Sequence, residues 1–517
     1  MSRLTAEHLD SLTPNDVVVT DTAPGPNSDP TAGTALGRSR APEAPSLADP
    51  DHPLVTIGDS LTHGVTSGAV YRTELSWPAL AALALGQKLG PADFAVPSYR
   101  GPLGGLPLNI EGLLRKLQAK FGNDLSMFEK LEFPIVLQRL LDGNEDYWER
   151  GDGSKPAPTG TRWSNLGIYG WDLRDALESC AGRAVEMTSE PAHDGFFGAT
   201  PDHDNDIAAA SVLAPFGPSA TQLSAADSLG AHGGIGTLVV ALGSNNALDA
   251  VVSKAVKWSG PGFDDLDRKA AFNVWRPTHF AIEFNRLVTS LKKITATRVV
   301  LATVPHVTVA PIAKGVNTDP KRRGKKWEDG SRYFPYYCDP WIEEKDFRPD
   351  RHRHITHQQA RAIDSAIDQY NVTIVDAVRA ARKQGRQWFV LDLCGLLDGL
   401  AYRRYEKDSK AAADNQWVPY ELPKPIEHLD SRFFRSDRSG RLQGGLFGLD
   451  GIHPTTSAYG VVAHELLQVL AVAGVTSKPI DFTALLARDT LNSDPPALVN
   501  SMLQLIAPFA TRFVSRA

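Results

Sequence analysis

Short apolar runs alternate with amphipathic helical stretches from Leu54 onward, and this alternation strongly limits the folds open to the chain. Each run is followed by a Gly, Pro, Asp or Asn turn signal, as expected for buried strands joined by helices. Such βαβ units place neighbouring strands parallel in one sheet. The predicted strands are 54–57, 166–169, 237–242, 298–304 and 372–375, and a sixth run, 388–393, is a candidate extra strand.

Two of the intervening helices can be recognised from the spacing of their apolar residues. The repeats are Phe280, Phe284, Leu287 and Leu291 in the first helix, and Ile363, Ile367 and Tyr370 in the second. Both match one face of an α-helix, which is most simply a core face. The second helix is preceded by Thr356 and carries Gln359 three residues later, a capping box that predicts where this helix begins.

The length of 517 residues predicts either two domains or one domain with large insertions. Residues 22–50 are crowded with Pro, Gly, Ala, Asp and Ser, so we predict that 1–50 is a disordered tail or linker, with 17–19 as a stray strand or a docking arm. We assign 51–475 to one α/β domain and 476–517 to a C-terminal helical extension. The segments that do not fit the alternation are predicted insertions, at about 90–160, 180–232, 306–355 and 380–447.

Composition excludes several classes of protein. Hydrophobic residues make up 42% and charged residues 22%, as in ordinary globular proteins. The net charge is −6 and acidic and basic residues are interspersed, so the sequence does not indicate a basic surface that would bind nucleic acid. The three cysteines, Cys180, Cys338 and Cys394, are too few and too far apart for a disulfide framework, and none has the spacing of a zinc site. The N-terminus lacks the apolar run of a signal peptide and no stretch is long enough to span a membrane, so we expect a soluble cytoplasmic protein.

The first predicted strand leads directly into the turn Gly58-Asp59-Ser60-Leu61. The glycine permits a sharp turn, and a serine at the start of a helix is exposed beside backbone amides that stabilise negative charge. Both features suit a nucleophile. The alternative interpretation of Ser60 is an ordinary helix N-cap.

A serine nucleophile needs a base, and a histidine with a nearby carboxylate occurs near the C-terminus. Asp450 precedes His453 by three residues on a turn, a spacing that lets the carboxylate orient the imidazole. The alternatives for this pair are a capping aspartate beside a surface histidine, or two metal ligands without further partners.

Together these motifs resemble the SGNH, or GDSL-type, serine hydrolases, which carry four sequence blocks in this order. Gly58 to Leu61 matches the first block, and the segment containing Asp450 and His453 matches the last. The second block matches 165–170, with Gly170 as the glycine of the oxyanion hole and Gly167 as the second choice. The third block, usually Gly-x-Asn-Asp, matches 243–246, with Asn245 as the side-chain donor and Asn246 where the family usually has Asp.

This resemblance covers about half of the chain, near 54–89, 162–177, 235–305, 355–378 and 448–470. It implies an α/β fold, a three-layer α/β/α sandwich with a flavodoxin-like parallel sheet and large insertions. It also implies a hydrolase that cleaves small-molecule or lipid esters through Ser60, His453 and Asp450, with an oxyanion hole of Ser60, Gly170 and Asn245. Neither a metal nor an organic cofactor is required by this chemistry. Acyl transfer through the same acyl-enzyme, or a non-catalytic binding protein on this scaffold, are the alternatives.

Several features leave the substrate, the partners and the oligomeric state open. The apolar residues of 128–141 predict either a lid over an acyl pocket or a helix packed on the core. The basic run 321–326 is interpreted as a solvated loop, with attraction to an anionic substrate or lipid as the alternative. His352, His354 and His357 lie close in the sequence and are also expected in a solvated loop, and 496–509 is expected to form a docked terminal helix.

Overall fold

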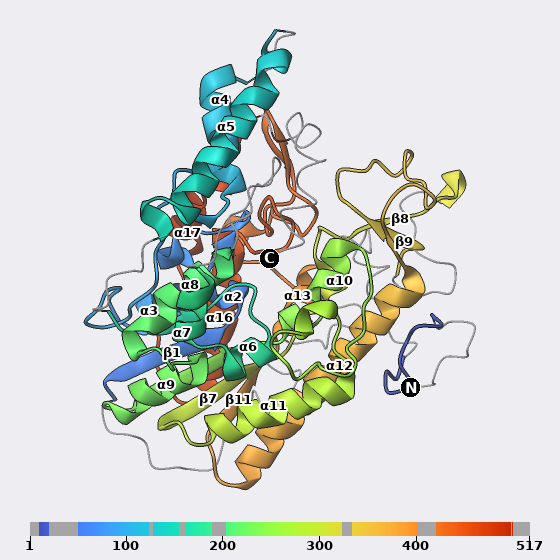
Figure 1. Cartoon of the computed structure of the whole chain (residues 1–517). Coiled ribbons are helices and arrows are strands. Elements are labelled where there is room, and N and C mark those ends of the chain that lie inside the picture. Colours follow the sequence, from blue (N-terminus) through green and yellow to red (C-terminus); the bar gives the residue numbers. More distant parts are fainter. Residues whose placement is uncertain are drawn as a thin grey trace.

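The computed structural model describes residues 10–19, 50–123, 128–154, 161–188, 203–322, 333–401, 420–497 and 499. Within them the chain is a mixed α/β protein built around one parallel sheet (Figure 1). The sheet strands are β1 (His52–Gly58), β5 (Asn165–Gly167), β6 (Ile235–Ala241), β7 (Ala296–Ala302) and β11 (Trp388–Leu391). Their order across the sheet is β11-β7-β6-β1-β5, and every neighbouring pair is parallel.

Numbered along the chain, the five strands lie in the order 2-1-3-4-5. The strand order reverses between β1 and β6, and in open parallel sheets ligands bind beyond the carboxyl ends of the strands at such a point. All residues of β6 and the last five of β1 are buried, which accounts for their continuous apolar sequence. The carboxyl ends of β1 and β6 are therefore where a functional site is expected.

The predicted alternation is confirmed for four strands and corrected for one. Segments 54–57, 166–169, 237–242 and 298–304 coincide with β1, β5, β6 and β7 to within a few residues. The fifth strand of the sheet is β11, within the run treated as a candidate extra strand and inside the segment 380–447 treated as an insertion.

The prediction of a strand at 372–375 was wrong, because these residues lie inside helix α12 (His357–Lys383). Ile374 and Val378 are buried and continue the helical stripe begun at Ile367 and Tyr370, whereas Val372 is exposed. A short β-branched run resembles a strand locally, but the periodicity over the longer stretch is helical. The predicted start of this helix is confirmed, since Thr356 caps it in a capping box with Gln359.

The remaining elements surround the sheet and fill the segments between its strands. The other helices are α2 (Ser60–His63), α3 (Trp77–Ala84), α4 (Ile110–Phe121), α5 (Glu129–Glu149), α6 (Leu173–Glu178), α7 (Ala181–Met187), α8 (Asp204–Leu213), α9 (Gln222–Ala231), α10 (Leu248–Ser253), α11 (Pro277–Leu291), α13 (Leu393–Leu400), α16 (Thr456–Val472), α17 (Phe482–Arg488) and α18 (Thr490–Ser493). The smaller sheets comprise β2 (Val65–Thr66), β3 (Ala69–Val70) and β4 (Leu106–Pro107); β8 (Lys314–Val316), β9 (Tyr336–Cys338) and β10 (Ile355–Thr356); and β12 (Arg435–Asp437) with β13 (Gly440–Gln443). The predicted apolar face of 280–291 is the buried face of α11.

The apolar segment 128–141 forms most of helix α5, which lies beside α4 at one end of the molecule (Figure 1). One face of α5 is buried and packs partly on α4, through the ring contact between Phe121 and Phe133. The opposite face leaves Phe128, Leu131 and Ile135 exposed. This segment is therefore a helical insertion that presents an apolar stripe on its outer side.

Residues 10–19 form a docked arm without a strand. Val17 and Val19 are buried, and Asp16 pairs with Arg276 at 2.8 Å (Oδ1 to Nε) and accepts a hydrogen bond from Thr278. The predicted linker from residue 22, the basic run beyond Arg322 and most of the predicted helix 496–509 lie outside the described residues. No helix in the described part of the chain is long and apolar enough to cross a membrane.

Candidate active site

Ser60 lies at the turn between the central strand β1 and the short helix α2. β1 ends at Gly58, the side chain of Asp59 caps α2, and Ser60 is its first helical residue. Only glycine fits at position 58, because a Cβ there would lie 2.0 Å from Thr62 Oγ1 and 2.7 Å from the carbonyl oxygen of Ala241. This tight turn places Ser60 at the carboxyl end of β1, beside the point where the strand order reverses.

Asp450 and His453 form a hydrogen-bonded pair on the loop that precedes α16. Asp450 Oδ2 lies 2.9 Å from His453 Nδ1, and Oδ1 accepts hydrogen bonds from the amides of Ile452 (2.8 Å) and His453 (2.9 Å). Both side chains are buried. Burial raises the pKa of Asp450, but the positive charge and N–H groups of His453 and the Ile452 amide lower it more, so the net pKa lies below its ordinary value. The carboxylate therefore stays ionised and fixes the orientation of the imidazole.

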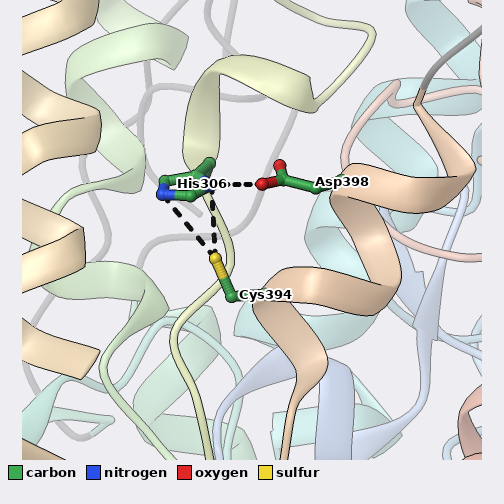
Figure 2. Close-up of side chains that lie close together, drawn as sticks. All are labelled: His306, Cys394 and Asp398. Atoms are coloured by element: carbon green, nitrogen blue, oxygen red, sulfur yellow. Dashed lines mark hydrogen bonds and ion pairs between the residues drawn. The ribbon is translucent and has the colours of Figure 1, made fainter. Parts of the chain in front are cut away.

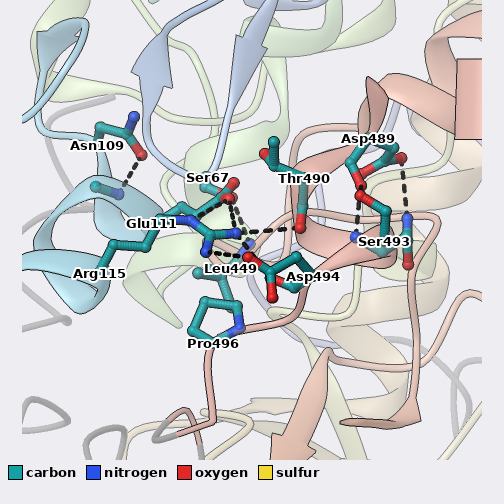
Figure 3. Close-up of polar contacts among 12 residues, drawn as sticks. Ser67, Asn109, Glu111, Arg115, Leu449, Asp489, Thr490, Ser493, Asp494 and Pro496 are labelled. Atoms are coloured by element: carbon teal, nitrogen blue, oxygen red, sulfur yellow. Dashed lines mark hydrogen bonds and ion pairs between the residues drawn. The ribbon is translucent and has the colours of Figure 1, made fainter. Parts of the chain in front are cut away.

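The loop that carries this pair is fastened to the segment that follows Ser60. The Gly68 amide donates to Asp450 Oδ2 at 2.6 Å. The Leu449 amide donates to Ser67 Oγ at 3.1 Å (Figure 3). The Tyr459 hydroxyl, on α16, donates to the carbonyl of Val65. Three contacts thus join residues 65–68 to the region around His453, although they are nearly four hundred residues apart in the sequence.

No hydrogen bond joins Ser60 to His453 among the described residues. His453 Nε2, the nitrogen that faces away from Asp450, is buried and makes no hydrogen bond to the described part of the chain. Catalytic hydrogen bonds are often long or poorly aligned before substrate binds. The structure therefore joins two of the three predicted catalytic residues and leaves the accepting nitrogen of His453 without a partner within the described chain.

The residue before Ser60 has a displaced pKa. Burial raises the pKa of Asp59 to about 6, and the Leu61 amide, the Ser244 side chain and the positive charge of His453 oppose this rise. The Asp59 carboxyl group therefore holds its proton to a higher pH than an exposed aspartate does.

His63 is also close to Ser60 in the sequence, but its surroundings exclude it as a general base. Its Nδ1 accepts a hydrogen bond from the Tyr169 amide at 3.3 Å, and burial lowers its pKa to about 3. No ion pair joins it to a carboxylate among the described residues. His63 is therefore a neutral core residue.

Gly170, on the turn after β5, and Asn245, on the turn after β6, lie close together. Asn245 follows β6, and its side-chain amide donates to the carbonyl of Trp171 at 2.9 Å, which holds it beside Gly170. Gly170 is half-buried with a φ of 76°, and its amide makes no hydrogen bond to the described residues. The amide of Gly167, by contrast, already donates to Asn165 Oδ1, and a Cβ at 167 would lie 2.4 Å from the backbone of α2. The geometry therefore favours Gly170 over Gly167 as an available donor.

Asn246, the departure from the family pattern, lies in the core beneath this turn. Its side chain is buried, and Oδ1 accepts a hydrogen bond from the Leu173 amide at the start of α6 at 3.3 Å. Its carbonyl accepts from the Trp275 amide. Asn246 thus connects three parts of the chain, whereas Asn245 remains half-buried beside Gly170.

The histidines that are close in sequence do not form a site in the described residues. His357 is buried at the start of α12, so its expected place in a solvated loop was wrong, and His352 and His354 pack around Phe347.

A different cluster of side chains was not predicted from the sequence. His306, Cys394 and Asp398 meet in the interior (Figure 2). Because His306 and Cys394 lie 88 positions apart in the sequence, no local motif predicts this cluster.

Comparisons with protein-family models, with curated proteins and with solved structures found no match to this chain. Fold and geometry define its class only broadly, as a mixed α/β protein with a central parallel sheet. It carries a serine at a tight turn after β1, candidate hydrogen-bond donors on the turns after β5 and β6, and an Asp–His pair on a loop that is fastened to the segment after the serine.

Proposed function

We propose that this protein is a serine hydrolase of carboxylic esters in which Ser60 is the nucleophile, His453 the general base and Asp450 the residue that orients it. The observation that carries the proposal is the buried Asp450–His453 pair. Its outward nitrogen, Nε2, is unengaged by the described chain, and its loop is fastened to the residues that follow Ser60. A capping aspartate would not need the histidine ring, and a surface histidine would not be buried.

The chemistry follows from the residue types. His453 Nε2 takes the proton of Ser60 Oγ as the oxygen attacks the acyl carbon, and the same nitrogen then donates that proton to the departing alcohol oxygen. His453 then deprotonates a water molecule that attacks the acyl carbon, the bond between that carbon and Ser60 Oγ breaks, and His453 returns the proton to Ser60 Oγ as the carboxylic acid leaves. Asp450 remains ionised throughout and stabilises the imidazolium.

The negative charge on the tetrahedral oxygen needs donors that are not already engaged. The Leu61 amide donates to Asp59, whereas the Ser60 and Gly170 amides make no hydrogen bond to the described chain. The Asn245 side-chain nitrogen has a second N–H besides the one that it donates to Trp171. These three groups are the proposed oxyanion hole.

The finer fold in this proposal is a three-layer α/β/α sandwich with a flavodoxin-like sheet, as the resemblance to SGNH hydrolases implies. It is supported by the strand order 2-1-3-4-5 and by the position of Ser60 and Asn245 after the strands on either side of the order reversal.

Hydrolysis of a simple aryl ester such as nitrophenyl acetate tests this function. Ser60→Ala should lower kcat by about 10⁶-fold, as loss of the nucleophile does in other serine hydrolases. The circular dichroism spectrum should not change, because one oxygen is removed at the first position of a four-residue helix. Ser290→Ala, near the C-terminal end of α11, is the control and should keep full activity. Turnover by purified Ser60→Ala at the rate of the unmodified protein would refute the proposal.

A further inference from the structure

His306, Cys394 and Asp398, none of which belongs to the candidate active site, bring an imidazole, a thiol and a carboxylate together (Figure 2). Nδ1 of His306 lies 2.9 Å from Asp398 Oδ2 and 3.2 Å from Cys394 Sγ. The ligand atoms of all three residues lie within 4.8 Å of one another, and all three residues are buried. No other group of this kind occurs among the described residues.

The scaffold holds these side chains before any ligand arrives. His306 follows β7, and Cys394 and Asp398 lie one turn apart on α13, which follows the neighbouring strand β11. Thr303, the residue after β7, accepts a hydrogen bond from the Cys394 amide at 2.9 Å and donates to Asp392, the N-cap of α13. The loop after β7 and the first turn of α13 are thereby fixed relative to each other.

The far nitrogen of His306 has a carboxylate partner of its own. His306 Nε2 lies 3.1 Å from Oδ1 of Asp368, a partly exposed residue of α12. When Nε2–H donates to Asp368, the lone pair of Nδ1 points at the Asp398 carboxylate and the Cys394 sulfur. The Nδ1 lone pair, the Asp398 carboxylate and the Cys394 sulfur then face one another, an arrangement that either a proton held among them or a metal ion stabilises. A metal-bound histidine characteristically donates its other N–H to a carboxylate in this manner.

We propose that His306 Nδ1, Cys394 Sγ and Asp398 Oδ2 bind a divalent transition-metal ion, Zn²⁺ being the ion that best suits this mixed set of ligands. Thiolate, imidazole and carboxylate are the three ligand types of protein zinc sites. Zinc–ligand bonds of about 2.0–2.3 Å in a tetrahedron place the ligand atoms about 3.4–3.6 Å apart. The observed separations of 2.9 and 3.2 Å reach this range with shifts of about half an ångström or less. The fourth position would be filled by a further donor such as water.

Charge supports a cation at this place. The carboxylates of Asp398 and Asp368 both contact the single imidazole, and the charge of Asp392 also acts on Asp398 and His306. A dication would balance this excess of negative charge in the interior and fasten α13 to the end of β7. The proposed site is independent of the proposed hydrolysis, because it contains none of the groups assigned to that reaction.

Cobalt in place of zinc gives the test a direct signature. The full-length protein, produced in cells grown with Co²⁺, should contain one metal ion per chain and show a thiolate-to-cobalt charge-transfer band. Cys394→Ser should lose this band, whereas Cys338→Ser, a buried cysteine on β9, should keep it. Asp368→Asn, a substitution at a partly exposed positioning residue, should weaken Co²⁺ binding by about 10–100-fold while keeping the band at saturating metal.

The unmodified protein alone can overturn the proposal. Absence of bound Co²⁺ and Zn²⁺ above the level of a control protein would leave His306 as an imidazolium between two carboxylates, without metal. An unchanged charge-transfer band in Cys394→Ser would place any bound metal elsewhere. If Cys394→Ser does not fold, Asp368→Asn provides the deciding comparison: metal affinity equal to that of the unmodified protein would contradict the proposed role of His306.

Discussion

Asp450 makes four hydrogen bonds, and the one to His453 Nδ1 matters for the proposed hydrolysis. In Asp450→Asn the side chain carries no negative charge. Its NH₂ group would also have to face N–H groups that donate to the carboxylate in the unmodified protein. We expect kcat for an aryl ester to fall by about 10⁴-fold, as it does in known serine proteases when the corresponding carboxylate becomes an amide. Steady-state kinetics measures the loss. A variant within a few-fold of the unmodified rate would show that a different group orients His453.

The ionisation of Asp59 should make stability depend on pH. Its pKa is about 6 in the folded protein and about 3.9 in the unfolded chain. Between these pH values Asp59 binds more protons in the folded state than in the unfolded state. Its contribution to the free energy of unfolding therefore falls as pH rises from about 4 to about 6. Asp59→Asn keeps a capping side chain but has no charge to bury.

Urea unfolding of this variant at pH 5 and pH 7.5 checks the expectation. The stability of Asp59→Asn relative to the unmodified protein should increase by about 1–2 kcal/mol between the two pH values. Asp376→Asn, at an exposed carboxylate of α12, controls for loss of one negative charge. A relative stability that is constant, or that falls as pH rises, would contradict the raised pKa of Asp59.

At the scale of elements, α12 depends on the cap that its sequence predicts. Thr356 Oγ1 accepts the Gln359 amide, and Gln359 Oε1 accepts the Thr356 amide. Thr356→Ala removes the acceptor of the Gln359 amide and should cost about 1 kcal/mol of unfolding free energy. Thr373→Ala, in the interior of the same helix, should be neutral or slightly stabilising because alanine has the higher helix propensity. Urea midpoints of the two variants measure the difference, and equal midpoints would argue against the cap.

The same helix shows where prediction from sequence succeeds and fails. Local signals sufficed for its start at Thr356 and for the buried faces of α11 and α12, because capping and helical periodicity depend on neighbouring residues. They wrongly predicted a strand at 372–375, where a β-branched run lies inside the long helix. They also gave only a candidate extra strand at 388–391, which completes the sheet. Tertiary packing decides between strand and helix for such short apolar runs.

At the scale of the whole molecule, a group of residues could be predicted only when its members lie close together in the sequence. Ser60 and the pair of Asp450 and His453 each lie in a local motif, so their residue types and turns could be predicted. The contacts that fasten Asp450 to Gly68 span 382 positions and have no sequence signal. The cluster of His306, Cys394 and Asp398 was missed for the same reason, since only the pairing of β7 with β11 brings it together.

Covalent labelling tests most directly whether Ser60 is an activated nucleophile. A fluorophosphonate probe, followed by peptide mass spectrometry of the full-length protein, should give one adduct, on Ser60. Labelling should disappear in Ser60→Ala and slow greatly in His453→Ala, because the serine then lacks its base. Absence of labelling in the unmodified protein, or an adduct on another residue that persists in Ser60→Ala, would contradict the account.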